Sequence, residues 1–338
     1  SPRRRLHEAT RVQSQEVRQV LNRLGRRQES RSEQSLCCLD EATRHVGAMK
    51  RIVTTALAAA SALAVAQVEA RTAGVSAKLR PDRIDIAYVE PKAAANQPVY
   101  KLLKEHRVLE KIRDLLRPLR LPHRLLLQTM DCDGISNAWS NEENVTVCYE
   151  YVNDIWKNVP EHTTPSGITP IDAMIGPLLD VFLHEAGHAT FRSLKVPLFG
   201  RNEDAADQFS TYLMLRFDKE EARRLILGSA YQYKGDLASP TLTVNQQNFA
   251  DEHGTPAQRF FNLLCTAYGS DPKLFADVVK EGFLPEDRAV GCEREYLQLS
   301  HAFETLIRPS IDRKLARKLH KRWLPPVTAK PEAWRSAD

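Results

Sequence analysis

Two histidines and a glutamate in the middle of the chain form a pattern that can bind a metal ion. The segment HEAGH places His184 and His188 four residues apart, with Glu185 directly after the first histidine. On a helix, side chains four residues apart project from one face, so both imidazoles can bind one ion. Zinc accepts two such nitrogens, and an adjacent carboxylate can take a proton from water at an open coordination position. The pattern therefore predicts a metal site with hydrolytic chemistry.

The segment NEDAAD, residues 202–207, adds two carboxylates that suit the same ion. Glu203 and Asp207 are again four residues apart, on a helix expected to run from about Asn202 to Phe217. Glu203 can supply a third ligand, while Asp207 can accept the free N–H of a ligand imidazole and so fix its tautomer. The alternative interpretation is an ordinary solvated acidic turn at a helix start, which the helix dipole favours.

Together the two segments resemble the gluzincin zinc metallopeptidases, the thermolysin-like group, whose pattern is HExxH followed on the next helix by NExxxD. Asn202, Glu203 and Asp207 match the second pattern letter for letter. Over about residues 84–297, the order of features is similar to a bacterial family of exported metallopeptidase-like proteins otherwise described as a domain of unknown function. The resemblance implies one catalytic Zn²⁺, Glu185 as general base, and a peptide or protein substrate.

The elements around the motif predict an α+β, zincin-like fold. The largely apolar run before HEAGH indicates a buried helix, and period-two alternation upstream indicates strands. We expect a small mixed sheet, formed before about residue 155 and packed on the HExxH helix, and a mainly helical C-terminal half. The expected strands are 83–89, 123–130 and 145–151, and the expected helices are 99–116, 219–233, 257–268 and two or more within 271–314.

A short stretch between two expected strands is a candidate substrate-binding edge. Asn137 and Ala138 begin the sequence NAWS, which is similar to the Asn-Ala-aromatic stretch on the edge strand above a gluzincin cleft. There an extended peptide binds by adding a strand. A turn shaped by the Asn and Ser side chains is the alternative interpretation.

Peptide hydrolysis also needs a donor that stabilises the oxyanion of the transition state. The resemblance implies a His or Tyr downstream of the metal helices. His253 is the leading candidate by position and residue type, and Tyr231 and Tyr233 compete with it. Alternatively, His253 only caps the helix that begins near Pro256.

The N-terminal 70 residues have the composition of a leader. Residues 1–48 are rich in Arg and Gln, and residues 49–70 combine a basic start, an apolar Ala-rich run and the small-residue site VEA. This order predicts a secretory signal peptide with Met49 as initiator, preceded by a non-native extension. A cytoplasmic arm ahead of a signal anchor is the alternative, but the run is short for a membrane span. We expect the mature domain at 71–316 and a basic tail at 317–338.

Charge and cysteine usage agree with export to the periplasm or the medium. Residues 1–70 hold 12 of the 48 basic and 7 of the 43 acidic residues, which leaves 36 of each in 71–338. The expected folded part thus lacks the basic footprint of a nucleic-acid-binding protein, and no nucleic-acid partner is predicted.

Four cysteines remain outside the leader, an even number that suits an oxidising compartment. Three pairings are possible. We favour Cys132 with Cys148 and Cys265 with Cys292, because each pair brackets one compact local unit. A Cys-ligated zinc is less favoured, since the chain has no C-x-x-C spacing.

These observations favour an exported zinc-dependent metallopeptidase. The alternative is an exported, non-catalytic zinc-binding or interaction protein of the same fold. A third hypothesis is a helical binding module in which HEAGH arises by coincidence.

Overall fold

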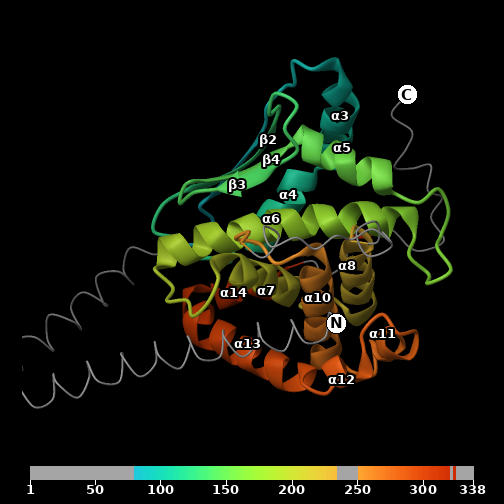
Figure 1. The fold of residues 1–338 in the computed structure, drawn as a ribbon. Coiled ribbons are helices and arrows are strands. Elements are labelled where there is room, and N and C mark those ends of the chain that lie inside the picture. Colours follow the sequence, from blue (N-terminus) through green and yellow to red (C-terminus); the bar gives the residue numbers. More distant parts are fainter. Residues whose placement is uncertain (1–79, 234–249, 320–322, 325–338) are drawn as a thin grey trace, which may run out of the picture. The chain divides into compact units, whose positions relative to one another are not determined.

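The computed structural model describes residues 80–233, 250–319 and 323–324 (Figure 1). The predicted signal peptide and its upstream extension lie outside these described residues, as do residues 320–322 and 325–338 of the predicted tail. Within the described ranges, no helix combines the length and the apolar character that a membrane crossing requires.

A mixed four-stranded sheet forms the N-terminal part of the described chain. Its strands are β1 (Ile84–Tyr88), β2 (Leu125–Met130), β3 (Ala138–Ser140) and β4 (Asn144–Cys148). Their order is β1-β2-β4-β3, with β1, β2 and β4 parallel and β3 antiparallel to β4 at one edge. Buried and half-buried residues alternate along β2, because neighbouring side chains in a strand point to opposite faces. One face of β2 therefore packs into the core.

Three helices of this half depart from the sequence prediction in their boundaries. The single helix expected over 99–116 is wrong: α3 (Gln97–Glu105) and α4 (Val108–Leu116) are separated at Arg107, which has a left-handed φ of 53°. The strand expected over 145–151 also ends early, and α5 (Tyr149–Asn158) begins directly after β4. Its buried Tyr149, Val152 and Ile155 recur every third residue, so burial of a helical face outweighs the local strand alternation.

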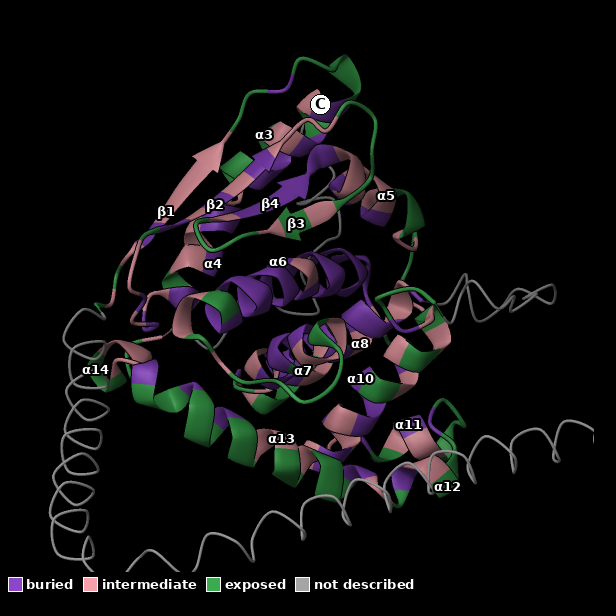
Figure 2. Ribbon diagram, turned by 60° about the vertical axis from the view of Figure 1, so that its left-hand side comes forward, coloured by how far each residue is buried: buried purple, intermediate pink, exposed green. Residues whose placement is uncertain are grey.

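The long helix α6 (Pro170–Leu194) lies between the sheet and the C-terminal helices (Figure 1). It begins with a capping box, in which Thr169 and Asp172 bond to each other's backbone N–H, and with Pro170 at its first position. It is buried along nearly its whole length (Figure 2). A helix with apolar residues on all sides needs neighbours on all sides, which explains its central place.

The C-terminal half of the described chain is helical, which confirms the predicted α+β fold. The helix expected over 202–217 ends three residues early, at Met214. The elements are α7 (Asn202–Met214), α8 (Lys219–Tyr231), α10 (Pro256–Ser270), α11 (Ala276–Lys280), α12 (Glu286–Ala289), α13 (Cys292–Leu306) and α14 (Arg313–Ala316), and short 3-10 turns lie at Ala94–Asn96 and Arg308–Ser310.

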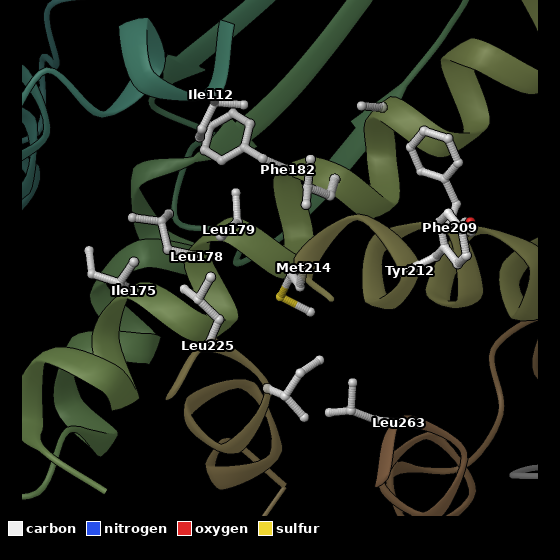
Figure 3. Close-up of a cluster of buried hydrophobic side chains, with 14 of the residues drawn as sticks. Ile112, Ile175, Leu178, Leu179, Phe182, Phe209, Tyr212, Met214, Leu225 and Leu263 are labelled. Carbon is white, nitrogen blue, oxygen red and sulfur yellow. The ribbon is translucent and has the colours of Figure 1, made fainter. Parts of the chain in front are cut away.

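The main core joins α4, α6, α7, α8 and α10. Figure 3 shows Ile112 of α4, Phe182 of α6 and Met214 of α7 directed into the same apolar cluster, together with Leu225 and Leu263 of the two later helices. All five side chains are buried. This cluster holds the two helices that carry the HEAGH and NEDAAD segments in a fixed relation.

Helices α6 and α8 cross at backbone contact. A Cβ added at Gly228 would lie 1.9 Å from the carbonyl oxygen of Asp172, and one added at Gly176 would lie 2.4 Å from the backbone nitrogen of Ser229. Only glycine fits at such an approach. The crossing brings Ser229 of α8 next to the middle of α6.

Two disulfides have the pairing that the sequence favoured. Cys132 and Cys148 have sulfurs 2.04 Å apart and join the ends of β2 and β4, and Cys265 and Cys292, with sulfurs 2.00 Å apart, join α10 to α13. Each pair closes a local unit of the fold.

Candidate metal site

The histidines of HEAGH and the glutamate of NEDAAD meet at one point between α6 and α7. The Nε2 atoms of His184 and His188 lie 3.1 Å apart, and Oε2 of Glu203 lies 3.0 Å from the first and 3.1 Å from the second. Both histidines are buried, and the carboxylate of Glu203 closes the triangle from the neighbouring helix. The structure thus brings together the three predicted ligands.

The chemistry of this donor set fits a zinc ion. The N–Zn distance of about 2.0–2.1 Å in a tetrahedral site places ligand atoms roughly 3.3 Å apart, close to the spacings of 3.0 to 3.1 Å found here. If His184 donates its Nδ1–H to Asp207, its Nε2 and the Glu203 oxygen both present lone pairs to each other. Such a triangle of electron-rich atoms is stable only around a cation or a shared proton.

Asp207 fixes the orientation of His184, as the sequence predicted it could. Its Oδ1 lies 2.7 Å from His184 Nδ1. It is in turn held by Arg259 of α10, which donates two hydrogen bonds at 2.7 and 2.8 Å. The resulting chain of Arg259, Asp207 and His184 sets the ring angle and tautomer of the ligand.

The pKa values of this chain are shifted by its hydrogen bonds. Burial lowers the pKa of His184, but its hydrogen bonds to Asp207 and Glu203 outweigh burial and raise that pKa to about 9. Burial raises the pKa of Asp207, but His184 and Arg259 outweigh it and lower that pKa to about 2. Asp207 is therefore a carboxylate at neutral pH, able to accept the imidazole N–H.

Glu203 also contacts the third histidine that the sequence singled out. His253 Nε2 lies 2.8 Å from Glu203 Oε2. Burial raises the pKa of Glu203, but its hydrogen bonds with the three histidines outweigh burial and place that pKa well below its usual range. His253 is not part of the group of three residues whose ligand atoms lie close enough together to hold one ion.

Asp180 is a buried acid that sequence reasoning missed. It lies one turn before His184 on the same face of α6, and its carboxylate accepts hydrogen bonds from Ser210 of α7 and Ser229 of α8. Burial raises its pKa, as does the nearby charge of Asp207, while the two serine hydroxyls act in the opposite sense. The position of this acid inside an apolar run, four residues before a ligand, is the signal that could have identified it.

A cleft of about 370 Å³ opens over the three ligands and Glu185. Residues of the edge strand β3 and of the motif helix α6 line it. The predicted residues Asn137, Ala138 and His253 line it, whereas Tyr231 and Tyr233 do not. Besides the ligands and Glu185, the lining residues are Asn137, Ala138, Trp139, Ser140, Tyr151, Asp180, Val181, Arg192, Gln232, His253 and Arg259.

Tyr151 is a second lining residue that the sequence did not reveal. It lies on α5, upstream of HEAGH, whereas the resemblance implied a donor downstream of the metal helices. Its hydroxyl has no hydrogen-bond partner among the described residues, and burial raises its pKa to about 12, so it stays a neutral O–H donor. Because the sequence predicted a strand over 145–151, Tyr151 was not identified as a residue of the site.

His184, His188 and Glu203 form a group that could hold a metal ion, and they line an open cleft together with Glu185. Residues 88–307, more than half of the chain, match the model of the DUF4344 family, described as "Putative metallopeptidase". The chain belongs to this family. Searches of curated proteins and of solved structures returned no match.

Proposed function

We propose that this chain is an exported zinc-dependent metallopeptidase in which Glu185 is the general base. The observation that carries the proposal is the triangle of His184, His188 and Glu203 at the floor of an open cleft, with Glu185 on the same helix and lining the same cleft. Membership of a metallopeptidase family supports it.

Each side chain has a distinct role in this proposal. When bound, a zinc ion supplies Lewis-acid polarisation of the scissile carbonyl and acidifies water. Glu185 takes the proton of the attacking water and delivers it to the leaving amine. Asp207 keeps the imidazole of His184 in the tautomer that leaves its Nε2 free for the ion.

The oxyanion that forms on the substrate needs donors that are already in place. Tyr151 offers a neutral hydroxyl that no described residue uses, and His253 offers a ring N–H beside Glu203. We assign the first donor to Tyr151 and the second to His253, because both line the cleft that contains the proposed ligands and Glu185.

The decisive experiment compares wild type with Glu185→Gln on casein and on a peptide library, with zinc measured in parallel. The substitution preserves volume and removes the base, so zinc occupancy and melting temperature should be unchanged while hydrolysis falls at least about a hundredfold. In the same panel, Tyr151→Phe should lower kcat and leave zinc content unchanged.

The alternative is an exported protein that holds zinc without catalysis, and the contact between His253 and Glu203 is the observation that favours it. In that case His253 would close the open position. Wild type with full zinc that cuts nothing across a broad panel, together with loss of zinc in His253→Ala, would replace the peptidase proposal with this one.

Export is the second part of the proposal. Two disulfides that join separate elements support an oxidising compartment, and the sequence places a signal peptide at residues 49–70. We expect N-terminal sequencing of the native exported fraction to give a start near Arg71. A start at Ser1 in a cytosolic fraction would contradict export.

A further inference from the structure

The edge strand above the cleft has a defined set of free backbone groups. In β3, Ala138 faces Val147 and Ser140 faces Val145. The hydrogen bonds to β4 are made by the alternate residues. The Cys148 N–H donates to the Asn137 carbonyl at 3.1 Å, and the Asn141 N–H, two residues beyond Trp139, donates to the Asn144 carbonyl. The N–H and C=O groups of Ala138 and Ser140 therefore point to the open edge. The Ala138 N–H donates to the Asn137 side chain at 2.9 Å, so the Ala138 carbonyl and the Ser140 N–H are the groups with which an extended peptide can pair.

Arg192 limits this edge at one end. It lies on α6, one turn after His188, and its Nη2 donates to the backbone oxygen and to the hydroxyl of Ser140, both at 2.8 Å. The last outward carbonyl of β3 is thus already satisfied. A peptide that pairs with β3 meets the guanidinium of Arg192 where the ladder ends.

The charge of Arg192 is not neutralised within the described part of the chain. Its side chain is exposed, and no described carboxylate lies within ion-pair distance, whereas Arg259, the other cleft cation, is paired with Asp207 at 2.7 Å. Only one of its nitrogens is engaged by Ser140. The remaining N–H groups suit a carboxylate, which arginine binds with two parallel hydrogen bonds.

The helix fixes the distance between this cation and the ion position. Four helical residues, from His188 to Arg192, rise about 6 Å, and an extended peptide advances about 3.3 Å per residue. A carboxylate held by Arg192 therefore lies about two residues from the scissile bond.

We propose that Arg192 is a specificity-determining residue that selects peptides carrying a carboxylate about two residues from the scissile bond. The carboxylate is either an Asp or Glu side chain or the terminal carboxylate of the peptide. This proposal rests on the proposed peptidase function, because it assumes that the cleft binds extended peptides along β3.

The test measures binding and cleavage separately. Zinc-loaded Glu185→Gln is titrated with a positional-scanning peptide library in which Glu replaces Gln at each position, each peptide being made with a free and with an amidated C-terminus. In the wild-type background, the same peptides give kcat and KM. We expect one Glu position, or the free C-terminus, to improve binding and to lower KM about tenfold, as one well-placed charged pair would.

Variants separate selection from a structural role. Arg192→Gln should abolish the preference, and Arg192→Glu should transfer it to Lys-bearing peptides. Arg192→Lys, which keeps the charge but loses the planar fork, should keep part of it. Lys195→Gln removes the same charge three residues later, at an exposed residue outside the cleft lining, and should leave the preference intact.

The outcomes are distinct. Peptides that bind and are cut without regard to carboxylates overturn the role of Arg192 and leave the peptidase intact. An equal loss of binding for all peptides in Arg192→Gln and Arg192→Lys assigns Arg192 to holding β3 and also overturns selection. A protein that binds no peptide and cuts none overturns both proposals.

Discussion

His184 is contacted at both ring nitrogens, so two neighbouring carboxylates determine the orientation of its imidazole. Nδ1 contacts Asp207 at 2.7 Å and Nε2 contacts Glu203 at 3.0 Å. His188 has one engaged nitrogen, because its Nδ1 is buried and finds no partner among the described residues. The two histidines are therefore unequal, and the orientation of the site rests mainly on His184.

The first prediction contrasts the two carboxylates of α7. Glu203→Ala removes a ligand and should abolish stoichiometric zinc binding. Asp207→Ala removes only the partner of a ligand and should weaken zinc affinity by about 10- to 100-fold, with the fold retained. Equilibrium dialysis against a zinc chelator of known affinity measures both. If Glu203→Ala binds zinc as tightly as wild type, the third ligand has been assigned wrongly.

The residues within each motif could be predicted because helical spacing alone fixes which side chains share a face. The partners that lie outside the two motifs could not be predicted. Arg259 is 52 residues from Asp207 and reaches it only when α10 packs against α7. A charged residue within the apolar pattern of 257–268 is a signal for burial with a partner, but it does not name the partner.

At the level of helices and strands, the packing of α6 against its neighbours positions the site. The helix meets α8 with backbone against backbone at Gly228 and Gly176. The predicted α+β class was confirmed, but this crossing was not anticipated, because sequence periodicity reports which face of a helix is buried and not how closely its partner approaches. Two of the boundaries that were wrong lie at Arg107 and Cys148, where the chain direction changes within one residue.

The second prediction concerns Gly228, where helix propensity and packing have opposite effects on the free energy of unfolding. Helix propensity alone predicts that Gly228→Ala stabilises the protein by about 1 kcal/mol. The added Cβ would lie 1.9 Å from a backbone oxygen, so we expect destabilisation of about 3 kcal/mol or more. Urea unfolding measures the free energy.

Gly291→Ala is the matched control, since its Cβ would meet only the flexible Glu295 carboxylate at 3.4 Å. Its effect should stay within about 1 kcal/mol. A stabilised Gly228→Ala would show that α6 and α8 lie further apart than described.

At the scale of the whole molecule, the last described residues pack back against the helical half. Trp323 packs edge-on against Phe217, with ring centroids 5.3 Å apart. The buried Glu221 of α8 accepts hydrogen bonds from the backbone N–H groups of Trp323 and Leu324. These two residues fall within the predicted tail, yet they pack against the helical half.

The third prediction concerns the pH dependence that Glu221 imposes. Burial raises its pKa, although the N–H groups of Leu324 and Trp323 act in the opposite sense. A raised pKa in the folded state means that the folded protein holds the proton more tightly than the unfolded chain. This contribution to stability is therefore lost as the pH rises above the usual glutamate range.

Glu221→Gln removes the ionisation and keeps an acceptor for the two N–H groups. Its free energy of unfolding, relative to wild type, should increase between pH 4 and pH 7. Glu220→Gln, at the exposed neighbouring residue, should show no such trend. If the free energy of unfolding of Glu221→Gln, relative to wild type, fell between pH 4 and pH 7, the buried charge would be favourably compensated.

The three ligands lie on two consecutive helices joined by an exposed loop, so a bound ion acts as a removable staple. It would close the chain between α6 and α7, as Cys132–Cys148 closes the sheet and Cys265–Cys292 closes the last helices. A reductant would break the two disulfides, and a chelator would remove the ion between α6 and α7. Loss of the ion should therefore loosen the segment 195–201, whose Phe199 is fully exposed, and make it the first place where a protease cuts the protein itself.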